Sequence, residues 1–246
     1  MAKTPDTRPG SSSFLASFTR PTPAIVVLTV AFVVAAVVGT SFPGVSVFLP
    51  SWPAWVLRAL DIAVLSAPLV IGAVLAVRVG TRPHAWVRAL RRWRVGDLLI
   101  GACVGALVRA AVELSAPTTG SLEGPFVEEP SFSRYATLAV VIVTAVLLSP
   151  VIEEVFFRGI ALPALANGLR GAGPTIAGTV ALVLTTAAFV ALHLLPLGGS
   201  APLGLVIGTI GVGVGCGILT LVTGRLAAAL AAHIVFNTIG VVLMLG

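Results

Sequence analysis

Apolar residues occur in seven long runs, separated by short segments rich in Gly, Pro and charged residues. A hydrocarbon core of about 30 Å needs about 20 mostly apolar residues per helical crossing, and each run can supply them. The runs cover about residues 24–42, 57–79, 97–116, 134–167, 174–197, 202–223 and 225–246. The pattern therefore predicts an all-α, polytopic helical membrane protein with about seven transmembrane helices.

The fourth run, 134–167, is longer than one crossing requires. Proline lacks a backbone N–H and disturbs the helical turn before it, so Pro150 is a place where this run can break. The run either projects from the membrane as one helix or breaks near Pro150. The number of crossings is accordingly six to eight.

Composition supports a membrane location. The 246 residues are 57% hydrophobic and only 10% charged, which is more apolar surface than one water-soluble core can bury. Residues 1–23 are polar, and the apolar run after them exceeds the roughly 7 to 15 residues of a signal peptide. We expect a polar cytosolic tail at 1–23, a single transmembrane domain at 24–246, and the lipid bilayer as the main partner.

The formal net charge of +6 does not indicate a nucleic-acid partner, because the basic residues are spread along the chain as topology signals. Most of them fall in the tail, after the second run and in the turns after the fourth and sixth runs. These segments lie on one predicted side of the membrane, and the positive-inside rule assigns that side to the cytosol. The N-terminus is therefore expected in the cytosol, and the expected location is a bacterial plasma membrane.

Residues 83–95 have an amphipathic pattern. Trp86, Leu90 and Trp93 recur at helical spacing on one face. The other face carries four arginines, Arg88, Arg91, Arg92 and Arg94. This pattern predicts a helix lying on the cytosolic leaflet, with an ordinary basic loop as the alternative.

Few polar residues fall inside the apolar runs. Cys103 and Cys216 have no metal-ligand spacing, so each is expected to be a small packing residue without a disulfide. Asp61 follows Arg58 by three residues, which predicts a local ion pair. A charged side chain in lipid is costly unless it faces a cavity or a partner. Candidate chemistry therefore rests on the remaining polar residues, Arg109, Glu153, Glu154, Arg158, His193, His233 and Asn237.

Glu153 and Glu154 lie in the segment PVIEEVFFRGIA, residues 150–161. Adjacent residues on a helix differ by about 100° in direction, so the two carboxylates lie on different faces of the helix. Glu154 precedes Arg158 by four residues, the favourable order for an ion pair. Glu153 is then not needed for this ion pair and is a candidate for a role in chemistry. The alternative is that both are interfacial acids that end a span.

His193 is predicted to lie at the same depth as Glu153. The midpoint of the two positions is residue 173, inside a Gly- and Pro-containing turn at 171–174. Both residues then stand about 30 Å from that turn on antiparallel helices. His233 is only about 14 Å from the turn at Gly224, so the hairpin of the fourth and fifth spans must protrude or tilt, and a protruding hairpin is favoured.

His233 and Asn237 are four residues apart and share one face of the last span. Two aligned polar side chains can serve a site, or they can form hydrogen bonds between helices. Together the three segments are EExxxR at 153–158, FxxxH at 189–193 and HxxxN at 233–237. This ordered set resembles the CAAX protease and bacteriocin-processing family, also called the Abi family, over about residues 134–246. The first three spans carry no motif of the family.

The resemblance implies an all-helical intramembrane endopeptidase with its catalytic core at 134–246 and a peptide or membrane-protein substrate. In that picture Glu153 and His193 activate a water molecule, and His233 with Asn237 stabilises the oxyanion. Glu154 and Arg158 match the remaining motif positions and would be a structural ion pair.

A metal is the main alternative in the mechanism. Glu153, His193 and His233 could supply three zinc ligands, with water as the fourth. The zincin motif HExxH is absent, and asparagine is not a preferred zinc ligand. The sequence therefore favours a glutamate-type enzyme without a cofactor, with zinc as the alternative.

The sequence fits two other classes of intramembrane protease poorly. A diaspartyl protease would need two facing aspartates, but Asp61 and Asp97 begin their spans on opposite predicted sides. A serine protease is disfavoured because Ser149 precedes Pro150 and has no flanking glycines. The alternative to an enzyme is a non-catalytic scaffold, a bacteriocin-immunity protein or a transporter. The six glycines of the sixth run fit close helix packing or an interrupted transport helix.

Overall fold

The chain forms a bundle of long helices. The computed structural model describes residues 18–81, 93–119, 131–198 and 200–245. These residues contain no β-strand, only one isolated bridge between Phe18 and Thr81. Seven helices in the described part of the chain are long and apolar enough to cross a membrane. The predicted fold class, a polytopic helical membrane protein with seven spans, is confirmed.

The helices lie close to the bounds that hydropathy predicts. They are α1 (Pro21–Ser41), α2 (Ala54–Gly80), α4 (Val95–Ser115), α5 (Ser131–Val143), α6 (Ser149–Phe156), α7 (Leu162–Gly168), α8 (Pro174–Leu194), α9 (Leu203–Thr223) and α10 (Ala227–Leu245). Short 3₁₀ turns occur at Val45–Val47, Arg170–Ala172 and Leu195–Leu197. Helices α5, α6 and α7 are consecutive parts of one 37-residue span, Phe132–Gly168.

The long fourth span does not break at Pro150, so this alternative was wrong. A π-helical turn, Thr144–Leu148, ends two residues before Pro150, and a second, Phe157–Ala161, ends two residues before Pro163. In an α-helix the proline ring clashes with the carbonyl four residues earlier. In both cases that carbonyl belongs to a π-helical turn, whose wider hydrogen-bond spacing relieves the clash.

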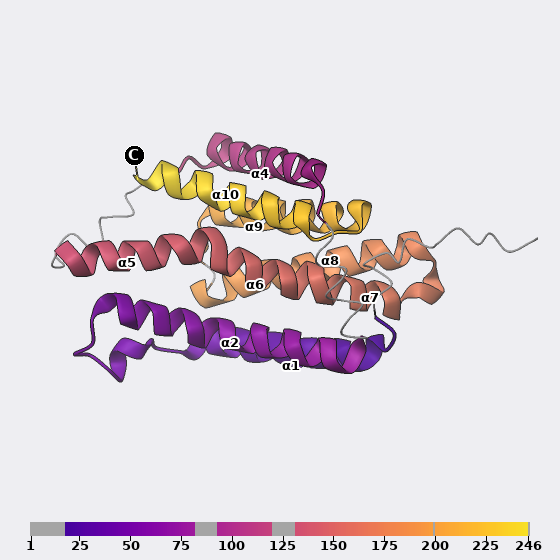
Figure 1. The fold of residues 1–246 in the computed structure, drawn as a ribbon, viewed down its shortest axis with the longest axis horizontal. Coiled ribbons are helices and arrows are strands. Elements are labelled where there is room, and N and C mark those ends of the chain that lie inside the picture. The colour runs from indigo at the N-terminus through magenta and orange to yellow at the C-terminus, as the bar shows by residue number, and fades with distance from the viewer. Residues whose placement is uncertain (1–17, 82–92, 120–130, 199, 246) are drawn as a thin grey trace, which may run out of the picture.

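The helices are arranged in three layers (Figure 1). Helices α1 and α2 pack together on one side, the α5–α6–α7 span and α8 lie in the middle, and α4, α9 and α10 form the other side. The hairpin of α7 and α8 extends past the turn between α9 and α10. This is the protruding hairpin that the depth of His233 predicts, and it brings α6, α8 and α10 side by side.

The outside of the bundle is apolar, as a lipid-facing surface must be. Large side chains such as Leu114 and Val222 are more than three-quarters exposed. The interior is packed around α6 and its second π-helical turn, where Phe156, Phe157 and Ile160 are buried. The segment that carries the predicted residues Glu153 and Glu154 is therefore also the centre of the core.

Glycines of α9 allow its neighbours to approach closely. A β-carbon on Gly211 would lie 2.6 Å from Val108 of α4, and one on Gly213 would lie 2.8 Å from Thr186 of α8. Helix α9 is continuous from Leu203 to Thr223, so it is not an interrupted transport helix. The glycines thus serve helix packing.

Polar anchors lie at the helix ends. Asp97 at the start of α4 accepts hydrogen bonds from Arg225 in the α9–α10 turn, with Nε 2.6 Å from Oδ2. The predicted ion pair of Asp61 with Arg58 was wrong within the described residues. Asp61 Oδ1 instead accepts a hydrogen bond from the backbone N–H of Val45 at 2.7 Å. Arg before Asp is the less favourable order for a helical pair.

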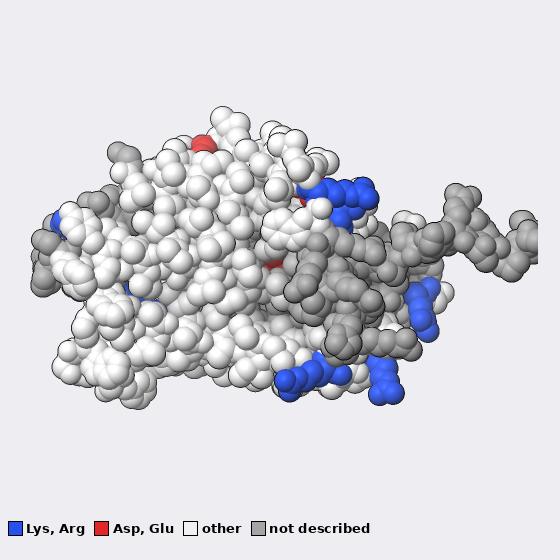
Figure 2. All heavy atoms as spheres, viewed as in Figure 1, with Lys and Arg blue, Asp and Glu red and all other residues white. Residues whose placement is uncertain are grey.

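Several predictions have a simple outcome. Cys216 is buried, as its predicted packing role requires, whereas Cys103 is exposed, so the packing role predicted for Cys103 was wrong. Most of the predicted interfacial helix at 83–95 lies outside the described residues, so it stays a prediction. The cytosolic tail at 1–23 also lies mostly outside the described residues and stays a prediction. The single domain at 24–246 stays a prediction as well. In Figure 2 basic side chains gather mainly at the end of the bundle that carries the α7–α8 turn.

Candidate active site

The ion-pair centre, formed by Glu154, Arg158 and His233, is buried. Glu154 is 0% exposed, and Arg158 Nη1 donates a hydrogen bond to its Oε1 at 3.1 Å. Arg158 Nη2 donates a second bond to the carbonyl of Gly213 in α9 at 3.1 Å. The guanidinium also lies 4.5 Å from the ring centre of Phe189. The ion pair that the i, i+4 spacing predicts is therefore present and joins α6, α8 and α9.

His233 of α10 completes this centre. Its Nδ1 lies 2.9 Å from Glu154 Oε1. A carboxylate paired with Arg158 can only accept, so Nδ1 of His233 carries the proton. The ring is thereby fixed with Nε2 directed away from Glu154. Sequence reasoning placed His233 and Glu154 in separate roles and did not predict this contact.

Glu153 faces the other way. Its Oε2 lies 3.8 Å from Nε2 of His193 and 3.8 Å from Nε2 of His233. Both distances exceed a direct hydrogen bond, and at such a separation a bridging water is the first arrangement to consider. The side chains of Glu153 and His193 are 15% and 27% exposed. The structure thus brings Glu153, His193 and His233 to one point, from three different helices.

His193 is oriented by its own helix. Its Nδ1 lies 2.9 Å from the carbonyl oxygen of Phe189, one turn earlier, and its ring packs on Phe189 at 4.5 Å between centres. A carbonyl only accepts, so Nδ1–H donates and Nε2 of the neutral ring keeps a lone pair. The FxxxH spacing therefore aims an acceptor nitrogen toward Glu153.

Asn237 lies one turn beyond His233 on α10. Its Nδ2 donates a hydrogen bond of 2.7 Å to the carbonyl of Ala145, inside the first π-helical turn. A carboxamide has two N–H groups, so one remains for another acceptor. The hydrogen bond fixes the amide plane and leaves that second donor available.

One cavity of about 810 Å³ is lined by residues of α4, α6, α8, α9 and α10. The side chains of Glu153, His193, His233 and Asn237 all line it. Arg109 of α4, a candidate polar residue to which sequence reasoning assigned no role, also lines it. Arg109 bonds to Glu113 and to Thr118, and its guanidinium lies 5.6 Å from the ring centre of Phe236. The i, i+4 spacing of Arg109 and Glu113 was the available signal for this pair.

The cavity residues allow a test of metal binding. Tetrahedral zinc ligands at about 2.1 Å from the metal stand about 3.4 Å apart, closer than the 3.8 Å observed from Glu153 to each histidine. Within the described ranges, no group of three or more His, Cys, Asp and Glu side chains is positioned to hold a metal ion. A shared metal would require these side chains to close by a few tenths of an ångström.

Comparison with known proteins adds one finding. Residues 135–239 match the family model described as type II CAAX prenyl endopeptidase Rce1-like. This range contains Glu153, Glu154, Arg158, His193, His233 and Asn237, whereas Arg109 and Met244 of the cavity lie outside it. No curated protein and no solved structure matches the chain.

Proposed function

We propose that the chain is an intramembrane endopeptidase whose water is activated by Glu153 and His193, and the match of residues 135–239 to the type II CAAX prenyl endopeptidase Rce1-like family model supports this. The observation that carries the proposal is the position of Glu153 Oε2, 3.8 Å from Nε2 of both histidines and at the wall of the 810 Å³ cavity. A carboxylate and an acceptor nitrogen that converge without bonding each other suit a water held between them.

In the proposed reaction the water donates one hydrogen bond to Glu153 and one to Nε2 of His193. Its oxygen attacks the carbonyl carbon of the scissile peptide while Glu153 takes the proton. The C–N bond of the tetrahedral intermediate then breaks, and the proton passes from Glu153 to the leaving amine. The second proton of the water stays on the attacking oxygen, so the products are a carboxylic acid and an amine, which then exchange a proton to give a carboxylate and an ammonium group, and no cofactor is consumed.

His233 and Asn237 would stabilise the oxyanion. Since Nδ1–H of His233 is directed to Glu154, the ring can donate from Nε2 only as an imidazolium. Asn237 would donate its second N–H, the one that Ala145 does not use. Donors fixed before the reaction stabilise a developing charge without reorganisation, typically by several kcal/mol. In this proposal Glu154 and Arg158 position His233 and do not contact the substrate.

The substrate class is a peptide or membrane protein that enters the cavity within the bilayer. The test is to compare processed membrane proteins in cells with wild type and with Glu153→Gln. New termini present with wild type and absent with the variant are expected. Identical sets of termini would contradict the proposal and favour a scaffold, an immunity protein or a transporter.

The orientation follows from the positive-inside rule, which assigns the basic end of the bundle to the cytosol. An impermeant thiol reagent added to intact cells should label Ser51→Cys in the α1–α2 loop and miss Arg170→Cys in the α7–α8 turn. Both positions are exposed. Labelling of Arg170→Cys alone would reverse the orientation.

A further inference from the structure

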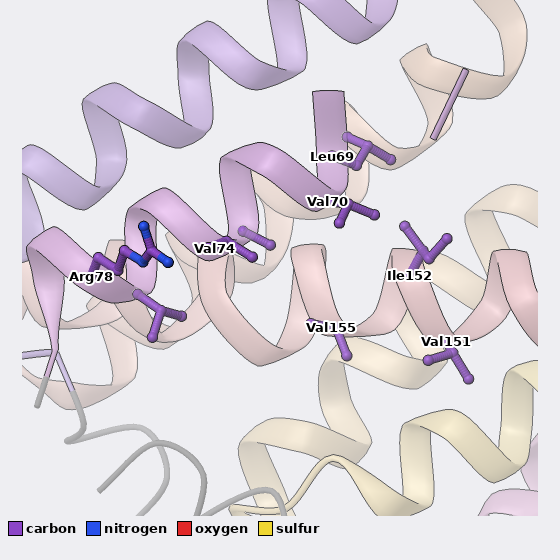
Figure 3. Close-up of a pocket in the computed structure, with 9 residues that line it drawn as sticks. Leu69, Val70, Val74, Arg78, Val151, Ile152 and Val155 are labelled. Atoms are coloured by element: carbon purple, nitrogen blue, oxygen red, sulfur yellow. The ribbon is translucent and has the colours of Figure 1, made fainter. Parts of the chain in front are cut away.

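A second cavity lies on the outside of the bundle, between α2 and α6. It has a volume of about 430 Å³ and is lined by side chains that include Leu69, Ala73, Val74 and Arg78 of α2 and Ile152 and Val155 of α6. We call it the α2–α6 groove. Figure 3 shows the α2 side chains following the helix, with Leu69 at one end and Arg78 at the other, opposite Val151, Ile152 and Val155.

The groove is apolar along its length. Leu69 and Ala73 form a buried floor, 5% and 8% exposed, whereas Val70 and Val74 are 43% and 46% exposed at the rim. Arg78 is the one charged residue among the side chains that line it. An apolar groove with an arginine at one end suits a ligand that has a hydrocarbon chain and an anionic headgroup.

The dimensions match one leaflet of a bilayer. Leu69 and Arg78 are nine residues apart on α2, which corresponds to about 14 Å along the helix axis. Half of a hydrocarbon core of about 30 Å is about 15 Å. Arg78 lies two residues before the end of this span, so its guanidinium reaches the headgroup level when Leu69 is near the bilayer centre.

Arg78 is available for an anion. It is exposed, and none of the ion pairs among the described residues uses it. It lies in the last turn of α2, at an end of the bundle where basic side chains gather in Figure 2. Guanidinium groups bind phosphate with paired N–H donors. A phosphate at this level is that of a phospholipid headgroup.

From this geometry we propose that the α2–α6 groove is a binding site for an anionic phospholipid, with one acyl chain between α2 and α6 and the phosphate on Arg78. The site is separate from the catalytic cavity, and the proposal does not depend on the proposed function. Ile152 and Val155 line the groove from the helix that carries Glu153, so the bound chain packs against α6 from outside.

The test is thermal unfolding of the purified full-length protein with added phosphatidylglycerol or phosphatidylcholine. Saturating phosphatidylglycerol is expected to raise the wild-type Tm by about 5 °C or more over phosphatidylcholine. Arg78→Gln should remove most of this difference. The matched control, Arg170→Gln, changes an exposed arginine in the α7–α8 turn outside the groove and should keep it. Retention in Arg78→Gln, or equal loss in Arg170→Gln, would overturn the proposal.

A second pair of variants tests the chain site. Val74→Trp places bulk at the groove rim and should weaken stabilisation by both lipids, whereas Val30→Trp, on the exposed face of α1, should not. Inorganic phosphate alone should give no shift. An Arg78-dependent shift with phosphate alone would indicate a simple anion site instead. If Val74→Trp lowered cleavage but kept the lipid preference, the groove would hold substrate, and the proposal would be wrong.

Discussion

Glu153 and Glu154 are neighbours in the chain, but α6 presents them to different surroundings. Glu154 is fully buried and bonded to Arg158 and His233, which are themselves almost fully buried. Glu153 lines the cavity. Its Oε2 lies 3.8 Å from Nε2 of His193 and of His233, which is beyond direct hydrogen-bonding distance. In one region buried charges are paired with one another, although Glu154 Oε2 and Arg158 Nε have no hydrogen-bond partner among the described residues, and in the other region polar groups face a cavity that can hold water or a substrate.

In the proposed function, stability and chemistry are divided between two neighbouring residues of one helical turn. Removing one partner of a buried ion pair strands the other charge, so we expect single substitutions in the ion-pair centre to lower stability. Partly exposed groups that lack protein partners contribute little to folding and remain available for catalysis. His233 belongs to both regions, since Nδ1 faces Glu154 and Nε2 faces Glu153.

The largest expected effect is on stability. Glu154→Gln leaves Arg158 without a counter-ion in a buried setting, and such a loss typically costs about 3 to 5 kcal/mol. The Tm should fall by about 10 °C or more. Adding Arg158→Met should recover part of the loss, because the stranded charge is then gone. Thermal unfolding of the single and double variants measures both changes. No recovery in the double variant would mean that the ion pair is not the cause.

A smaller effect is expected for Asn237→Ala, which removes a proposed oxyanion donor. Loss of one such donor lowers kcat by about 100-fold or more, with little change in KM. Thr238→Ala is the matched control, because that exposed hydroxyl bonds only to the carbonyl of Ile234 in its own helix. Steady-state cleavage of a peptide substrate separates the two. Unchanged kcat in Asn237→Ala would remove this residue from the proposed oxyanion site.

The smallest expected effect is that of chelation, which should leave activity unchanged. In the proposed mechanism Glu153 and the histidines act on water directly, so exhaustive dialysis against a chelator removes nothing that the reaction needs. Elemental analysis should find no stoichiometric zinc in active enzyme. Loss of activity that added zinc restores would favour the alternative with Glu153, His193 and His233 as metal ligands.

The spans and the division between the two glutamates could be predicted from sequence because both depend on local periodicity. Hydropathy located α1 and α2 within about three residues of their observed starts, at Pro21 and Ala54. The i, i+4 spacing identified the Glu154–Arg158 pair, and symmetry about the turn at residue 173 placed His193 at the depth of Glu153. These inferences require only helical geometry.

The remaining features depend on contacts between distant segments. The ion pair of Asp97 with Arg225 joins residues 128 positions apart, and no local pattern indicates it. Arg109 reaches the cavity because α4 packs on α10, where Gly240 leaves room for its guanidinium. The π-helical turn before Pro150 is a change of hydrogen-bond register that hydropathy does not detect. Sequence therefore located the candidate residues but not the walls of their cavity.

In the proposed function Glu153 takes part in catalysis, whereas Glu154 stabilises the fold. The most direct test is to measure cleavage and thermal unfolding on the same preparations of wild type, Glu153→Gln and Glu154→Gln. Glu153→Gln should keep the wild-type Tm within about 2 °C and lose about 100-fold or more in cleavage rate. Glu154→Gln should lose stability as described above. A stable but inactive Glu154→Gln together with an active Glu153→Gln would contradict the account and reverse the two roles.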